Sequence, residues 1–179
     1  GEEWENFLPL TFTKPVAAVR MGILTFVERW EKITNKKVSF LTQNYLSEKF
    51  PADFQSENLF INPAFFPSKK LIDTILNLNL GQSIVYKNQL VAVKTVEQTP
   101  TITVDVIDFD EEIIHIQHSW DLFTYNFQAI DFDFDLVTEG RTSQPISPTN
   151  GVLNPDRIFI EEGAFVEFAT LNATDGPIY

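Results

Sequence analysis

The segment FLPLTFTKPVAAVRMGILTFVERWEKI, residues 7–33, is the most informative part of this chain. Pro9 and Pro15 lie six residues apart. Residues 7–20 can therefore form neither a regular helix nor a central strand, and we predict an ordered loop there. Over residues 22–33 the apolar side chains recur at helical spacing, which predicts an amphipathic helix. The first unit of the chain is a loop that leads directly into a helix.

Beyond this helix, short strand patterns alternate with helical ones. Apolar and β-branched runs bounded by turn residues predict strands at residues 38–42, 58–62, 83–87, 90–95, 101–107 and 113–117. Apolar residues at helical spacing predict two more helices, over residues 67–81 and 119–130. This mixture predicts the α/β class, with a mixed sheet and flanking helices.

The C-terminal residues follow a different pattern. Residues 158–166 (IFIEEGAFV) fit I-x-I-x-x-G-A-x-V, which is typical of a parallel β-helix, and residues 176–179 begin what would be the next rung. Residues 138–157 are polar and interrupted by Pro and Gly, so they are a predicted linker. The expected organisation is a domain over residues 1–137, this linker, and the first, truncated rung of a β-helix over residues 158–179.

The charge of the chain is divided unequally. The formal net charge is −12, yet residues 1–94 hold 11 basic and 9 acidic side chains, whereas residues 95–179 hold 2 and 16. No basic cluster is present, which excludes nucleic acid and anionic membrane surfaces as expected partners. A phosphate site is expected in the first half, and a cation site in the second.

Composition limits the remaining classes of protein. The chain has no cysteine, which excludes a thiolate metal site and a cysteine nucleophile and suits a reducing, cytoplasmic location. No apolar run approaches the roughly 18 residues that a membrane span needs. The acidic start of the sequence lacks the pattern of a signal peptide. Gly1 is not preceded by Met, so the position of the true N-terminus is not assigned. The truncated rung likewise leaves the true C-terminus unassigned.

Pro9-Leu10-Thr11, followed by Lys14-Pro15 and the helix over residues 22–33, resembles the signature loop of sugar nucleotidyltransferases. These enzymes join a sugar 1-phosphate to a nucleoside triphosphate. In that family an apolar strand and a Gly-rich loop with a catalytic Arg come before Pro-Leu-Thr. The whole chain resembles members in which this domain precedes a left-handed β-helix acyltransferase domain built from hexapeptide repeats. Such members are sugar-1-phosphate uridylyl- or thymidylyltransferases, or bifunctional N-acetylglucosamine-1-phosphate enzymes.

The resemblance implies transfer of a nucleotidyl group to a sugar 1-phosphate with Mg²⁺, in a protein that trimerises through its β-helix. In-line attack on an α-phosphate requires cations that neutralise the growing negative charge. The resemblance assigns that catalytic role to Lys14 and Arg20. It places Leu10 and Thr11 at the nucleotide, and Asn62 near the metal or the sugar.

The sequence departs from the family pattern at two of these places. Asn6 stands where the catalytic Arg is expected, three residues before Pro9, and the Gly-rich run is reduced to Gly1. Asn62 stands where the family usually has a metal-binding Asp. A second interpretation therefore stays open, namely a catalytically degenerate domain that docks substrate or a partner for a β-helix acyltransferase.

Three other motifs contain residues capable of chemistry. Residues 131–135 (DFDFD) resemble a D-x-D metal site, or else an amphipathic segment with its phenylalanines inward and its carboxylates in water. His115 and His118 would point to opposite sides of a strand end, which disfavours a metal site. Arg141, the first cation after Lys94, is expected to form a structural ion pair.

Overall fold

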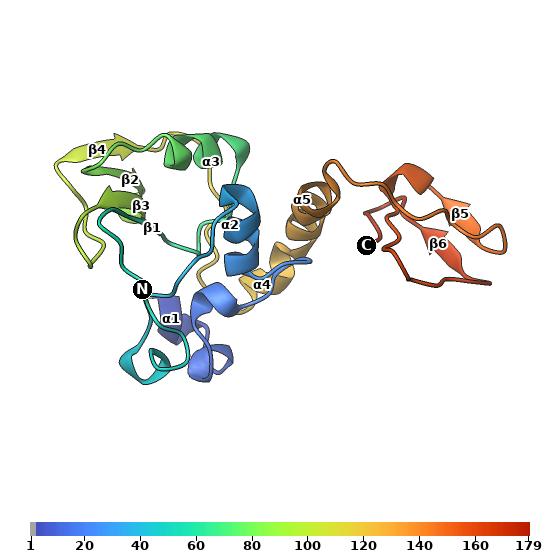
Figure 1. The fold of residues 1–179 in the computed structure, drawn as a ribbon, viewed down its shortest axis with the longest axis horizontal. Coiled ribbons are helices and arrows are strands. Elements are labelled where there is room, and N and C mark those ends of the chain that lie inside the picture. Colours follow the sequence, from blue (N-terminus) through green and yellow to red (C-terminus); the bar gives the residue numbers. More distant parts are fainter. Residues whose placement is uncertain (1–2) are drawn as a thin grey trace.

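The computed structural model describes residues 3–179. Figure 1 shows an N-terminal part that contains a sheet and helices, a C-terminal part with two strands, and helix α5 between them. The helices are α1 (Glu3–Asn6), α2 (Phe26–Thr34), α3 (Lys69–Leu76), α4 (Asp121–Thr124) and α5 (Asn126–Thr138). The strands are β1 (Asn58–Ile61), β2 (Gln82–Tyr86), β3 (Gln89–Thr95), β4 (Asp105–Asp108), β5 (Gly151–Leu153) and β6 (Thr170–Asn172).

The N-terminal sheet has the strand order β1-β3-β2-β4. β3 is antiparallel to both of its neighbours, whereas β2 and β4 are parallel, so the sheet is mixed. The predicted α/β class with a mixed sheet and flanking helices is confirmed. The strands predicted at residues 83–87 and 90–95 form a hairpin, and its turn residues Lys87 and Asn88 both have positive φ, at 50° and 64°, as a type I′ turn requires.

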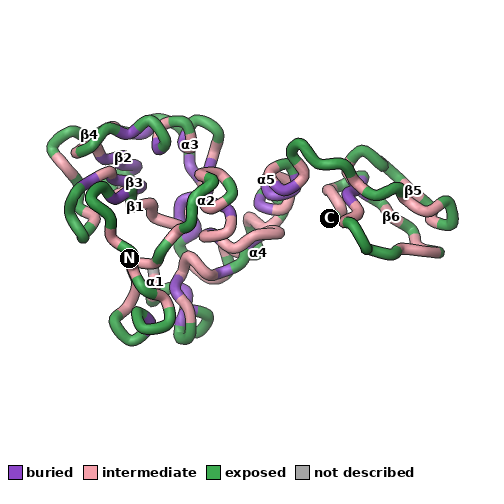
Figure 2. The backbone as a smooth tube through the Cα atoms, in the orientation of Figure 1, coloured by how far each residue is buried: buried purple, intermediate pink, exposed green. Residues whose placement is uncertain are grey.

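Two apolar clusters form the core of the N-terminal part. The first joins the sheet to α2 and α3 through Trp30, Leu71, Ile75, Ile84 and Val91. The second joins the N-terminal loop to α5 through Phe7, Val19, Met21, Phe26, Phe66, Ile116 and Ala129. Figure 2 shows this burial along β2, β3 and α5, whereas most of the C-terminal part is exposed or half-buried.

Helix α2 begins four residues later than the spacing predicts. Thr25 is its N-cap: the Thr25 hydroxyl accepts a hydrogen bond from the Glu28 N–H, and the Glu28 carboxylate accepts one from the Thr25 N–H. This reciprocal capping box fixes the start of the helix. The helix ends at Asn35, whose φ of 51° is left-handed, a conformation that Asn tolerates.

Two predicted strands are wrong. Residues 38–42 form no strand, because they have no neighbouring strand to pair with among the described residues and instead line a groove. Residues 113–117 contribute only an isolated bridge between His115 and Phe65. The strand expected over residues 101–107 is shortened to β4.

The helix predicted over residues 119–130 is interrupted at Tyr125 and continues to Thr138. Its N-cap, Trp120, makes no side-chain capping bond. The Asp121 carboxylate instead accepts hydrogen bonds from the N–H groups of Gln117 and His118, which precede the helix, at 2.9 Å each. The DFDFD motif therefore lies within α5.

The C-terminal part contains parallel pairings. β5 pairs with β6, with Gly151 opposite Thr170, and a parallel bridge joins Ile158 to Ile178. The partners are 19 and 20 residues apart in sequence, so the chain returns in the same direction beside itself. The Arg141 guanidinium lies 2.5 Å from Glu161, which confirms the expected ion pair. Across residues 3–179, no helix is long and apolar enough to cross a membrane.

Candidate functional site

A groove of about 850 Å³ lies in the N-terminal part. Its walls include segments that are distant in sequence: residues 15–17 of the loop, the side of α2 that carries Trp30, residues 38–43 and 52–55, β1 with the two residues after it, and residues 88–92. This volume falls within the range of about 300–1,000 Å³ that is typical of small-molecule sites. The polar or charged residues of the lining include Thr34, Lys36, Lys37, Thr42, Gln43, Asp53, Gln55, Glu57, Asn58, Asn62, Asn88 and Gln89.

The loop that contains the Pro-Leu-Thr motif is closed by reciprocal hydrogen bonds. The Thr11 hydroxyl donates to the Trp4 carbonyl at 2.9 Å, and the Trp4 indole N–H donates to the Thr11 carbonyl at 3.1 Å. The Tyr45 hydroxyl also donates to the Thr11 carbonyl. Thr11 is fully buried, whereas its neighbour Leu10 is 42% exposed. The Thr11 side chain therefore stabilises the loop, and Leu10 faces solvent.

The two predicted catalytic cations have different surroundings. Lys14 is half-buried, and its ammonium has no hydrogen-bond or ion-pair partner within residues 3–179. Arg20 is exposed and is already paired, because its guanidinium lies 3.2 Å from the Glu28 carboxylate and donates to the Ile23 carbonyl. Lys14 is thus the cation of the loop that is available to an anionic ligand.

The remaining predicted residue, Asn62, lies at the end of β1 and lines the groove. Its side-chain oxygen accepts a hydrogen bond from the Ala64 N–H at 3.0 Å. Leu10, Thr11, Lys14 and Arg20 are not among the lining residues, although Pro15, next to Lys14, is. The structure thus brings Asn62 and the segment after Lys14 to one groove, and it leaves Arg20 outside it.

A buried ion pair anchors the end of the loop to α5, and sequence reasoning missed it. The Arg29 guanidinium binds the Asp133 carboxylate at 2.7 and 2.9 Å, and both side chains are buried. The second Asp133 oxygen also accepts the N–H groups of Ile23 and Leu24, at 3.0 Å each. Arg29 in turn donates to the Met21 carbonyl at 2.5 Å. Residues 21–24 are held against α5 by this network.

Gly22 makes this contact possible. A Cβ atom at Gly22 would lie 2.6 Å from an Asp133 carboxylate oxygen and 2.8 Å from the backbone carbon of Ala129. The φ of Gly22 is +81°, a conformation that L side chains rarely adopt. The Gly22 N–H donates to the Asn126 side chain at 2.8 Å. Only a glycine lets the loop approach α5 so closely.

The other two aspartates of the DFDFD motif bind Arg157. Its guanidinium pairs with Asp131 and, at 2.7 Å, with Asp135, and it lies over the ring of Phe134. The three aspartates therefore form ion pairs. The amphipathic interpretation holds for Phe132 and Phe134, which pack inward, and for Asp131 and Asp135, which stay partly exposed, but not for the buried Asp133. No group of three or more metal-ligating side chains occurs in the described part of the chain. The two histidines each stack on a ring, His115 on Phe65 and His118 on Trp120.

The sequence of residues 1–142 matches the profile of a family described as sugar nucleotidyl transferases. This chain belongs to that family. The matched span contains the loop, the groove and the Arg29–Asp133 network, and it ends before β5, so family membership covers the N-terminal part. A comparison with curated protein sequences gives no match.

Sugar nucleotidyl transfer is expected to involve Mg²⁺, and we tested whether the residues at the groove fit that ion. Asn62 offers a neutral amide oxygen that already accepts the Ala64 N–H. Among the acids of the lining, Asp53 accepts a hydrogen bond from Gln55, and Glu57 lies 3.7 Å from the Lys94 ammonium. These groups do not fit a protein-held Mg²⁺ at Asn62, since Mg²⁺ demands near-ideal octahedral oxygen geometry.

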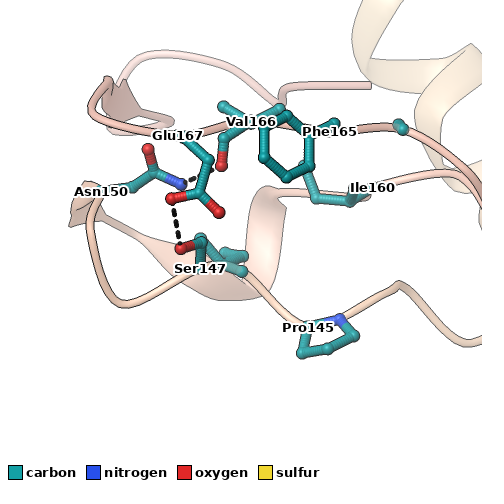
Figure 3. Close-up of a pocket in the computed structure, with 9 residues that line it drawn as sticks. Pro145, Ser147, Asn150, Ile160, Phe165, Val166 and Glu167 are labelled. Atoms are coloured by element: carbon teal, nitrogen blue, oxygen red, sulfur yellow. Dashed lines mark hydrogen bonds between the residues drawn. The ribbon is translucent and has the colours of Figure 1, made fainter.

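A second, smaller pocket of about 100 Å³ lies in the C-terminal part (Figure 3). Ser147 donates to the Glu167 carboxylate at 2.9 Å, and the Asn150 side chain donates to the Val166 carbonyl at 2.8 Å. These bonds join segments about 16 to 20 residues apart and stabilise the parallel arrangement. The pocket is too small for a sugar nucleotide.

Proposed function

We propose that this chain transfers a nucleotidyl group from a nucleoside triphosphate to a sugar 1-phosphate. The single observation that supports this most is Lys14, a half-buried residue on the loop that resembles the family signature, whose ammonium has no partner within residues 3–179. An ammonium that has no counter-charge in the protein is available to bind one from a ligand. A triphosphate supplies such a charge, and family membership supports this ligand.

In this proposal the folded loop presents the Lys14 cation to the ligand. Phe7 belongs to the second core cluster and Val16 packs against it. Between these two residues, the Trp4–Thr11 hydrogen bonds close the loop. The backbone of Lys14 therefore keeps its position without a ligand, which reduces the reorganisation that the loop needs in a transition state. Arg20 would add a second positive charge after release from Glu28.

The nucleotide would lie along the exposed face of the loop, against Leu10, while the buried Thr11 supports the loop from within. The sugar would extend to Asn62 in the groove. A phosphate oxygen of the sugar 1-phosphate attacks the α-phosphorus and forms a new P–O bond. The bond from the α-phosphorus to the bridging oxygen breaks, and pyrophosphate leaves. Lys14 offsets the negative charge that develops on the phosphates. Mg²⁺ would arrive bound to the triphosphate.

A second candidate function is supported by the C-terminal pairings. Parallel partners 19 and 20 residues apart fit successive rungs of a coil, and we propose that they begin a left-handed β-helix that trimerises in the full protein. The N-terminal part would then dock substrates for an acyltransferase. The exposed position of Asn6, at the expected place of a catalytic Arg, favours this alternative.

An activity assay separates the two functions. The chain is incubated with Mg²⁺, UTP or dTTP, and a panel of sugar 1-phosphates, and pyrophosphate release and sugar-nucleotide formation are measured together. Transferase function predicts both products, with turnover that falls about 10- to 100-fold in Lys14→Ala, since loss of a charge-assisted contact costs about 1.5–3 kcal/mol. Nucleotide binding without either product would support the docking function and contradict the transferase.

A further inference from the structure

Helices α4 and α5 carry three aromatic side chains that point away from the core. One side of the two helices packs in the second core cluster, through Leu122, Tyr125, Ala129 and Phe132. Trp120, Phe123 and Phe127 each lie two residues before one of the first three, and residues two apart on a helix point about 200° from each other. Trp120, Phe123 and Phe127 are 64%, 89% and 58% exposed. They form one surface, which we call the aromatic face.

The aromatic face is held in place by its own surroundings. The His118 ring stacks on the Trp120 ring, with the centroids 4.3 Å apart and the planes 8° from parallel. The N–H and the hydroxyl of Thr124 both donate to the Trp120 carbonyl. A Cβ atom at Gly176 would lie 3.3 Å from the Phe127 ring, so the C-terminal segment lies against one edge of the face. Rigid aromatic anchors of this kind lose little conformational entropy on binding.

The sequence around the aromatic face is almost uncharged, although the chain has a net charge of −12. Residues 113–130 contain no Lys or Arg and one acidic residue, Asp121. The Asp121 side chain is only 17% exposed, and its carboxylate accepts the N–H groups of Gln117 and His118. The centre of a protein interface is likewise poor in charge and rich in aromatic residues. A neutral face gives no attraction to a charged partner, so the surface that fits it is also uncharged and apolar.

The area of the aromatic face agrees with a pair of identical faces. At roughly 200 Å² for each aromatic side chain, the exposed fractions leave about 400 Å² open on one chain. Two copies that meet face to face bury about 800 Å² through these rings alone. The exposed Thr124 and Gln128 beside the rings extend the contact towards the roughly 1,000 Å² that a specific interface needs. A two-fold pair requires no second kind of surface, because both copies present the same neutral face.

We propose that the aromatic face binds the same face of a second copy of this chain, so that α4 and α5 form the centre of a two-fold dimer. Trp120, Phe123 and Phe127 do not line the groove, so the proposal is independent of nucleotide binding. Each copy carries a net charge of −12, and the two copies repel each other through their remaining surfaces. Added salt screens this repulsion and leaves the apolar contact intact, so it strengthens the dimer.

Sedimentation equilibrium over a range of protein and salt concentrations tests this proposal. We expect a monomer–dimer equilibrium that shifts to dimer as salt is added. Phe123→Asp should weaken the dimer about 100-fold or more, because a two-fold contact buries the new charge on both copies. Phe165→Asp is the matched control, since Phe165 is 84% exposed but lies in the C-terminal part, outside the aromatic face. It should leave the dimer unchanged, and circular dichroism confirms that both variants fold. A parent chain that is monomeric at every concentration, a trimer, or equal weakening in the two variants would overturn the proposal.

Crosslinking locates the contact. The chain has no cysteine, so a single introduced cysteine reports on one position. Thr124→Cys, beside the aromatic face, should be crosslinked to the second copy by a short bismaleimide. Thr101→Cys is equally exposed but lies outside the face, and it should stay uncrosslinked under the same conditions. A dimer that crosslinks at neither position, or equally at both, would overturn the assignment of the interface to α4 and α5.

Discussion

At the scale of single residues, Asp133 joins segments more than 100 positions apart in the sequence. Its carboxylate accepts two guanidinium contacts from Arg29 and the two N–H groups of Ile23 and Leu24. The described residues contain no buried side-chain polar atom without a partner. The pair is therefore stable as long as both members remain, and loss of one leaves a buried, unpaired charge.

We predict that Asp133→Asn lowers the free energy of unfolding by about 3–5 kcal/mol, because Arg29 stays buried without its counter-charge. Asp135→Asn is the matched control: it removes an aspartate from the same helix whose side chain is 68% exposed, and it should cost less than about 1 kcal/mol. Urea unfolding of both variants measures the difference. Equal losses would contradict the account of the Arg29 pair.

Gly22 gives a second prediction at this scale. Gly22→Ala combines a positive φ with a Cβ atom placed 2.6 Å from the Asp133 carboxylate. Gly140→Ala is the control, because Gly140 also has a positive φ, of +68°, but nothing lies within 4 Å of its Cβ position. Thermal unfolding should show the Gly22 variant to be less stable than the control by a further 1–3 kcal/mol or so. Equal melting temperatures would mean that the close approach of Gly22 to α5 does not add to the loss of stability.

At the scale of elements, α5 explains why Asp133 departs from the amphipathic interpretation of the DFDFD motif. Alternation with a period of two suggests a strand or a metal loop, but residues two apart on a helix point about 200° from each other. Asp133 therefore faces α2, while Asp131 and Asp135, four residues apart, share the face that meets Arg157. The Asp and Phe composition of the motif thus indicates charged and apolar helix faces, whereas its period of two does not indicate which face each aspartate occupies.

The start of α2 yields a pH prediction. The pKa of the Glu28 carboxyl is lowered, mainly because the carboxylate accepts the Thr25 N–H. Partial burial raises this pKa in opposition, and Arg20 lowers it by a smaller amount. A lowered folded-state pKa means that the stabilisation is present above the ordinary value of about 4.5 and is lost as the pH falls through the folded-state value. Glu28→Gln should therefore reduce stability at pH 7 and flatten its acid-side dependence.

The size of this effect is small, since the Glu28 side chain is 44% exposed. We expect less than about 1 kcal/mol at pH 7. Unfolding curves recorded between about pH 3 and 7 check the prediction. A Glu28→Gln variant whose stability falls with acid as steeply as that of the parent chain would contradict it.

At the scale of the whole molecule, the sequence predicts the fold class better than it predicts the candidate functional site. The alternation of short strands and helices predicted a mixed α/β sheet, and the Pro-Leu-Thr segment predicted the family that residues 1–142 match. The groove was not predictable from local patterns, because its walls come from residues as distant as Pro15 and Leu90. Residues 38–42 have a strand-like composition, yet a strand forms only where a partner strand supplies hydrogen bonds.

The uneven charge now has a structural counterpart. The first half of the chain contains the loop with its unpaired Lys14, whereas the acidic second half uses Asp131, Asp133 and Asp135 to hold α5 between two arginines. An anionic ligand is thus expected at the N-terminal loop and not near α5. This expectation and the family membership are tested together by one measurement of nucleotide binding.

That measurement is calorimetric titration of the chain with UTP or dTTP in the presence of Mg²⁺. We predict that one of the two nucleotides binds, and that Lys14→Ala weakens this binding about 10- to 100-fold, as loss of a charge-assisted contact implies. Lys69→Ala, which removes the same charge from an exposed position at the start of α3, should leave the affinity unchanged. Absence of binding by either nucleotide, or equal weakening in the two variants, would contradict a nucleotide site at this loop.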